Sequence, residues 1–191
     1  AVTGSLAWDN VDPGADIDYL IVTEPNRLWV TRWLVAALGR VAQRNGVSLC
    51  ANYMVSTRAL VLAERNLYGA YELARMIPIA GLGMYRRLRR ANSWAFAYLP
   101  NAVEIARPPM GVPRAAPGRA LVGIARLGAR ILRSPVGSVL ERLEMTYRIR
   151  KRARLGIEEG EASYGVDWYK AHTSGHRQRA LAAFGDRLRD L

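Results

Sequence analysis

Apolar residues along the first hundred positions follow two different periods, which separate strands from helices. Residues 19–22 form a continuous run of strand-forming residues after a Pro-Gly turn, and this pattern predicts a buried strand. A second apolar stretch over 48–56 predicts another strand. Between them, apolar positions recur every three or four residues over 27–45, which is typical of an amphipathic helix, and Asn45-Gly46 supplies its end.

Further helices are predicted after the second strand. One covers 66–76, with Asn66 as a plausible N-cap, and another covers 85–98. Trp29 and Trp33 lie at helical spacing in the first helix, which indicates core positions more strongly than surfaces for stacking on a base.

Proline and glycine are so dense after residue 98 that they divide the chain into parts. We expect residues 1–100 to form a core of the α/β (α+β) class and residues 101–118 to form a Pro-rich linker. Residues 119–191 are expected to form a basic helical tail. Residues 1–3 read as the end of a strand, so we also expect a strand or helix upstream of residue 1.

The net charge of +12 lies mostly in the C-terminal part of the chain. Residues 107–191 contain 17 basic and 8 acidic side chains. A positive surface attracts phosphate-rich partners, so nucleic acid is a candidate partner of the basic C-terminal helices. The alternative is a solvated helix surface, because an excess of arginine over lysine also follows from genome base composition.

The remaining composition excludes some classes of protein. Half of the residues are apolar, but charged residues interrupt every window of eighteen, so no membrane span is expected. The single cysteine, Cys50, excludes an internal disulfide and suits a reducing compartment, so a cytoplasmic location is expected.

Two carboxylates mark the start of the first apolar strand. Asp16 and Asp18 are separated by Ile17, and residues two apart in a strand project from the same face, roughly 6–7 Å apart. Carboxylates that close repel each other unless a proton or a cation lies between them. The natural cation for oxygen ligands is Mg²⁺ or Mn²⁺, so Asp16 and Asp18 are candidate metal ligands.

The residues before this pair extend the pattern. An apolar strand end is followed by Gly-Ser, then by ten residues, and then by acid-apolar-acid-apolar. This arrangement resembles the signature of the polymerase-β-type nucleotidyltransferases. The matching residues are Val2, Gly4-Ser5 and Asp16-Ile17-Asp18-Tyr19. The resemblance implies a nucleotidyltransferase-type mixed sheet flanked by helices, an NTP such as ATP bound at Gly4 and Ser5, and metal ions bound at Asp16 and Asp18.

One part of that signature is missing. The resemblance implies a third carboxylate on the strand beside the Asp-x-Asp strand, but the stretch 48–56 contains no acid, and Asn52 is the residue best placed there. An amide oxygen can bind Mg²⁺ without contributing charge, and it cannot accept a proton from an attacking hydroxyl. Glu64 and Glu72 are the nearest substitutes. Glu72 lies mid-helix, where some small-molecule nucleotidyltransferases place a base, and its alternative is a solvated helix-face glutamate.

The resemblance therefore implies an Mg²⁺-dependent enzyme. It would transfer a nucleoside monophosphate from an NTP to an unidentified hydroxyl or amine acceptor and release pyrophosphate. The arginines at 86, 87, 89 and 90 could place one or two guanidinium groups on the triphosphate, or could simply be solvated. The alternative function is a catalytically weakened nucleotidyltransferase-like domain that binds nucleotide or RNA as a sensor or interaction module.

Overall fold

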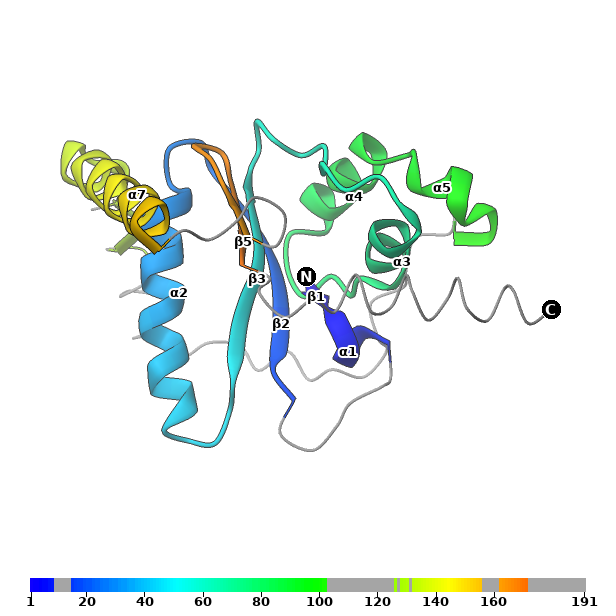
Figure 1. Cartoon of the computed structure of the whole chain (residues 1–191), viewed down its shortest axis with the longest axis horizontal. Coiled ribbons are helices and arrows are strands. Elements are labelled where there is room, and N and C mark those ends of the chain that lie inside the picture. The colour runs from blue at the N-terminus through cyan, green and yellow to red at the C-terminus, as the bar shows by residue number, and fades with distance from the viewer. Residues whose placement is uncertain (9–14, 103–125, 127, 131, 156–161, 172–191) are drawn as a thin grey trace.

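The structure is a computed structural model. It describes residues 1–8, 15–102, 126, 128–130, 132–155 and 162–171. These residues form a mixed α/β fold in which helices flank a five-stranded sheet (Figure 1). The predicted helical tail over 119–191 falls only in part within the described residues, and most of the predicted linker falls outside them.

The sheet has the strand order β1-β2-β3-β5-β4. β1 pairs with β2 antiparallel, β2 with β3 parallel, and β5 with both β3 and β4 antiparallel. The strands are β1 (Val2–Thr3), β2 (Ile17–Thr23), β3 (Leu49–Ser56), β4 (Ala162–Tyr164) and β5 (Trp168–Ala171). β2 and β3 confirm the two strands that the apolar runs predict.

The pairing of β2 with β3 contains an irregularity. Asp18 faces Cys50 and Leu20 faces Tyr53, so β3 has one more residue than β2 across this step. Such a bulge lets consecutive residues turn to the same side of a sheet. Asn52 and Tyr53 consequently both line one cavity on the α3 side of the sheet.

Helices cover both faces of the sheet (Figure 1). α2 and α7 lie on one face, over a core that contains Leu28, Trp29 and Met54. α3, α4 and α5 lie on the other face, over a core that contains Leu20 and Leu73. The helices are α1 (Gly4–Ala7), α2 (Leu28–Gln43), α3 (Leu67–Arg75), α4 (Leu82–Ala91), α5 (Ala95–Tyr98) and α7 (Pro135–Leu155), with a 3₁₀ turn at Pro100–Ala102.

Individual residues determine where α3 begins and where the helix after it is interrupted. The side chain of Asn66 accepts a hydrogen bond from the backbone N–H of Gly69, which confirms it as the N-cap of α3. The single helix predicted over 85–98 is wrong, because the structure divides it into α4 and α5. The break occurs where the buried Asn92 turns its side chain to the backbone of Leu60 and Leu62, two groups outside the helix.

The packing of α2 also corrects the sequence interpretation. Trp29 is fully buried, as predicted, but Trp33 is 50% exposed and is not a core residue. α7 packs near the first turns of α2 and supplies Glu141 there. Its two carboxylate oxygens accept hydrogen bonds from the backbone N–H groups of Trp29, at 3.0 Å, and Val30, at 2.7 Å.

The C-terminal region is not entirely helical, which corrects the predicted fold class in one respect. β4 and β5 form a hairpin that joins the edge of β3, so residues 162–171 belong to the same sheet as the N-terminal strands. The two strands of the hairpin have only three and four residues, which is too short for a periodic pattern to separate them from a helical tail. No helix among the described residues combines the length and apolarity needed to cross a membrane.

Candidate functional site

The Gly-Ser turn and the Asp-x-Asp strand meet at the edge between β1 and β2. Antiparallel pairing sets Thr3 opposite Asp18, and Gly4 follows directly at the start of α1. Gly4 has a φ of +68°, and a Cβ added there would lie 2.3 Å from Oδ2 of Asp18. Only glycine therefore leaves room for the Asp18 carboxylate against the backbone of the turn.

Glu72 projects from α3 toward the same point. The pKa of Glu72 is raised to about 7, mainly by burial and in addition by the charge of Asp18. The Tyr68 hydroxyl, the backbone N–H of Gly4 and the Lys170 ammonium group act in the opposite direction, since each favours the charged carboxylate. Oε1 of Glu72 is nevertheless enclosed and has no hydrogen-bond partner in the described structure. The structure thus brings Glu72 to Asp18 and Gly4, rather than leaving it on a solvated helix face.

Asp16 and Asp18 both affect the pKa of one neighbouring group, the thiol of Cys50. The pKa of the Cys50 thiol is raised to about 12, mainly by burial, then by Asp18, which hydrogen-bonds with the thiol, and by Asp16. Asp16 is exposed and Asp18 is half-buried. The two carboxylates therefore lie at the mouth of the site, and the neutral thiol opposite Asp18 contributes no charge there.

Asn52 lies deeper, in a cavity of about 50 Å³ between the sheet and α3. Asn52 is 5% exposed, and its Oδ1 has no hydrogen-bond partner in the described structure. Oγ1 of Thr3, which lines the same cavity, is also enclosed without a partner. Asn52 is therefore enclosed in the cavity, on a strand that lies between β2 and β5.

Lys170 closes the far side of the cavity. It projects from β5, where it pairs with Tyr53, and it forms an ion pair with Glu64. Glu64 is thus engaged by a cation, and of the two glutamates Glu72 is the one that lies beside Asp18. Tyr68 also lines the cavity, and burial followed by the charge of Glu72 raises its pKa above the ordinary tyrosine value.

The donor set fits a hard cation in part. Carboxylate and amide oxygens from Asp16, Asp18 and Asn52 are ligand types that Mg²⁺ accepts. Among the described residues, however, no group of three or more His, Cys, Asp or Glu side chains is arranged to hold a metal ion. Ser5 is half-buried in α1, beside Gly4.

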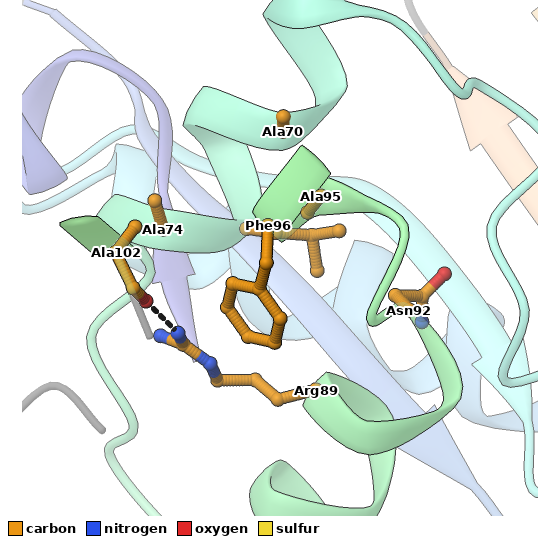
Figure 2. A pocket seen from close by; sticks show the side chains of 8 residues that line it. Ala70, Ala74, Arg89, Asn92, Ala95, Phe96 and Ala102 are labelled. Carbon is orange, nitrogen blue, oxygen red and sulfur yellow. Dashed lines mark hydrogen bonds between the residues drawn. The ribbon is translucent and has the colours of Figure 1, made fainter. Parts of the chain in front are cut away.

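Of the four arginines on α4, one is buried and three are exposed. Arg86, Arg87 and Arg90 are exposed, whereas Arg89 is 7% exposed. Arg89 donates a hydrogen bond to the carbonyl of Ala102 and lies over the Phe96 ring, beside a cavity of only about 10 Å³ (Figure 2). Arg89 thus ties α4 to the 3₁₀ turn, which leaves its guanidinium group committed to the fold.

Sequence reasoning missed three members of the site: Thr3, Tyr68 and Lys170. Thr3 is adjacent to the Gly-Ser motif, and Tyr68 precedes Glu72 by four residues on α3, so spacing could have indicated both. Lys170 had no such signal, because it reaches the cavity only through the β4–β5 hairpin. No protein-family model, curated protein or solved structure matches the chain.

Proposed function

We propose that the protein is an Mg²⁺-dependent nucleotidyltransferase. The observation that carries the proposal is the contact between Gly4 and Asp18, in which a Cβ on Gly4 would lie 2.3 Å from the carboxylate. Two motifs separated by ten residues of sequence thereby meet at one edge of the sheet. That arrangement supports a nucleotidyltransferase-type fold, in which Gly-Ser binds a triphosphate and Asp-x-Asp binds its metal ion.

In this proposal Asp16 and Asp18 hold Mg²⁺, and the metal supplies charge neutralisation of the triphosphate during nucleotidyl transfer. Gly4 leaves space for the Asp18 carboxylate, and Ser5 offers its hydroxyl to a phosphate oxygen. Glu72 supplies the third carboxylate from α3, because the facing position on β3 is Cys50. The cavity of about 50 Å³ is too small for a nucleotide, so the NTP lies outside it, at the exposed mouth near Asp16.

The experiment is turnover of labelled NTPs with Mg²⁺, followed by pyrophosphate release, for the parent protein and for Asp16→Asn and Asp18→Asn. The proposal expects each substitution to reduce turnover by about 10²–10³-fold, the size of effect of removing one group that stabilises transition-state charge. Glu24→Gln, which likewise converts a carboxylate to an amide but at an exposed position outside the site, is the matched control. Absence of turnover with every NTP in the parent protein would contradict the enzymatic proposal.

A second candidate is a catalytically weakened domain that binds nucleotide or RNA. It is favoured by the residue opposite Asp18, since the Cys50 thiol is neutral at pH 7 and cannot replace an aspartate as a metal ligand or base. This candidate expects NTP binding that is weakened by Asp18→Asn, with no pyrophosphate release. Equilibrium binding of labelled NTP under the same conditions separates the two functions.

A further inference from the structure

One side of α7 is apolar and exposed over the N-terminal half of the helix. Val136, Leu140, Leu143 and Tyr147 recur every three or four residues, so they lie on the same side. Each of these side chains is between 42% and 62% exposed. Trp33 of α2 is also half exposed, and it lines an open groove of about 330 Å³ together with Leu140, Leu143 and Tyr147.

This apolar side is not needed to attach α7 to the rest of the fold. The attachment is made mainly by the other side of the helix, where Glu141 is buried at the start of α2 and Met145 packs against the core that contains Trp29. A single exposed apolar side chain is ordinary, but a contiguous group that includes two aromatic rings marks an interaction site. The apolar side of α7 is therefore a candidate docking surface.

The exposed charges on α7 are all positive among the residues whose side chains the structure describes. Its acidic side chains are withdrawn from the surface, because Glu141 is buried and Glu144 forms ion pairs with Arg32 and Arg148. Positions 150, 151 and 154 continue the spacing of the apolar side, so that side becomes basic in the last turns. The exposed basic side chains are Arg142, Arg150, Lys151 and Arg154.

The apolar and basic parts together form an extended surface. They cover residues 136–154, which is about 27 Å of helix, whereas the groove takes up only the middle of this length. In Figure 1, α7 lies at the edge of the described structure, beside α2 and away from α3 and α4. A broad partner can therefore contact the whole length of the helix.

The combination of side chains favours an anionic lipid surface over other partners. Aliphatic side chains enter the boundary between headgroups and acyl chains, Trp and Tyr favour that boundary, and Arg and Lys attract anionic headgroups. A second copy of the chain would bring like charges together. Nucleic acid would pair with the basic side chains but would leave the apolar side in water.

We propose that the exposed side of α7, together with Trp33 of α2, binds the surface of a membrane that contains anionic phospholipids. The binding is peripheral, with the apolar half of α7 in the headgroup boundary and its last turns against the phosphate groups. It goes beyond the proposed nucleotidyl transfer, because it requires no nucleotide and uses no residue of the candidate site. Failure of either proposal would leave the other intact.

The test is co-sedimentation of the full chain with lipid vesicles. Vesicles of phosphatidylcholine alone would be compared with vesicles of phosphatidylcholine and phosphatidylglycerol in equal parts. We expect binding to the anionic vesicles only, and we expect salt to weaken it. Tryptophan emission should shift to shorter wavelength on binding, and Trp33→Phe should remove that shift because Trp33 enters the lipid boundary.

Leu143→Gln tests the apolar contribution. It replaces a side chain that is 62% exposed, so the fold should tolerate it, and it should weaken vesicle binding by about tenfold or more. Ile79→Gln is the matched control, because Ile79 is 51% exposed and lies between α3 and α4, outside this surface. It should leave vesicle binding unchanged, and circular dichroism establishes that both variants are folded.

The double substitution Arg150→Gln and Lys151→Gln tests the basic contribution. It should weaken binding to anionic vesicles by about tenfold or more, since each cation near such a surface contributes about fivefold. The control is Arg86→Gln with Arg87→Gln, which removes the same charge from exposed positions on α4, on the other face of the sheet. Its effect should be much smaller, because salt screens distant charges.

Four results would overturn the proposal. The parent protein could fail to sediment with anionic vesicles. Leu143→Gln could bind them as tightly as the parent, which would reduce the binding to general attraction of a cationic protein. The parent could self-associate without lipid in a way that Leu143→Gln abolishes, which would make a second copy the partner. An amphipathic helical peptide of Leu and Glu could bind the parent while the vesicles do not, which would make the partner an acidic protein helix.

Discussion

Glu141 and Glu72 are enclosed carboxylates on opposite sides of the sheet, and their surroundings differ. Glu141 lies between α7 and α2, and both of its oxygens accept hydrogen bonds from backbone N–H groups at the start of α2. Glu72 lies on α3 beside Gly4 and Asp18, and its Oε1 has no partner in the described structure. The helix dipole and two N–H groups stabilise the charge of Glu141, whereas burial and Asp18 oppose that of Glu72.

The difference separates a structural carboxylate from a candidate functional one. Folding alone accounts for Glu141, because its bonds complete the N-terminus of α2 and attach α7. Folding does not account for Glu72, since a neutral glutamine would fit its surroundings at lower cost. A residue that is unfavourable for stability and close to Asp18 and Gly4 is best explained by a ligand or a reaction.

The largest loss of stability is expected for Glu141→Ala. The substitution leaves the N–H groups of Trp29 and Val30 without acceptors, in a buried position at the helix start. We expect the free energy of unfolding to fall by about 3–4 kcal/mol, measured by urea denaturation. A loss below about 1 kcal/mol would mean that α7 does not hold α2 in solution.

Gly4→Ala should have the next largest effect. The alanine must adopt a φ of +68°, and its Cβ must displace the carboxylate of Asp18. We expect a loss of about 2–3 kcal/mol in stability together with loss of NTP turnover. Gly46→Ala is the matched control, because Gly46 has a φ of +75° with no atom within 4 Å of an added Cβ. Gly46→Ala should lower the free energy of unfolding by only about 1 kcal/mol. Equal losses for Gly4→Ala and Gly46→Ala would contradict the close contact between Gly4 and Asp18.

Glu72→Gln should stabilise the protein, with a defined pH dependence. The pKa of Glu72 is raised from 4.5 to about 7, so the folded state holds its proton more tightly than the unfolded state does. The stability of the parent protein therefore falls as pH rises through this interval. In EDTA, we expect Glu72→Gln to be more stable than the parent by about 2 kcal/mol at pH 8 and equal to it at pH 4. Destabilisation at pH 8 would show that the Tyr68 hydroxyl and the Gly4 N–H outweigh the cost of burying the carboxylate.

The smallest effect is expected for Glu24→Gln. Glu24 pairs with Arg133 at 2.6 Å, but both side chains are more than half exposed. Solvent and salt screen such a pair, so the urea midpoint should not change measurably. A clear shift of the urea midpoint would mean that exposed and enclosed carboxylates contribute alike to stability. The comparison of Glu141 with Glu72 would then have no basis.

Much of the fold follows from local sequence signals. The apolar runs predict β2 and β3, the helical period predicts α2, and Asn66 caps α3 as its residue type suggests. The β4–β5 hairpin could not be predicted, because its strands are short and acquire their stability from pairing with β3. The sequence also did not predict that Trp33 is exposed, since a helical period does not specify which face of the helix is covered.

Some residues of the candidate site could likewise be predicted from the sequence, and others could not. Gly4 and Asp18 could be predicted because their motif is local in sequence, and the structure places them in contact. Glu72 could be named as a substitute acid, but its burial depends on how α3 packs beside Gly4 and Asp18. The enclosed oxygens of Thr3 and Asn52 depend on strand pairing and on a bulge, neither of which leaves a pattern in the sequence.

Turnover of Glu72→Gln at pH 8 tests the central claim most directly, because stability and function should then move in opposite directions. Pyrophosphate release from NTP with Mg²⁺ would be compared with that of the parent protein, alongside the melting temperature of each. We expect turnover to fall by about 10²-fold or more while the melting temperature rises. A Glu72→Gln protein that retains the turnover of the parent would contradict the account.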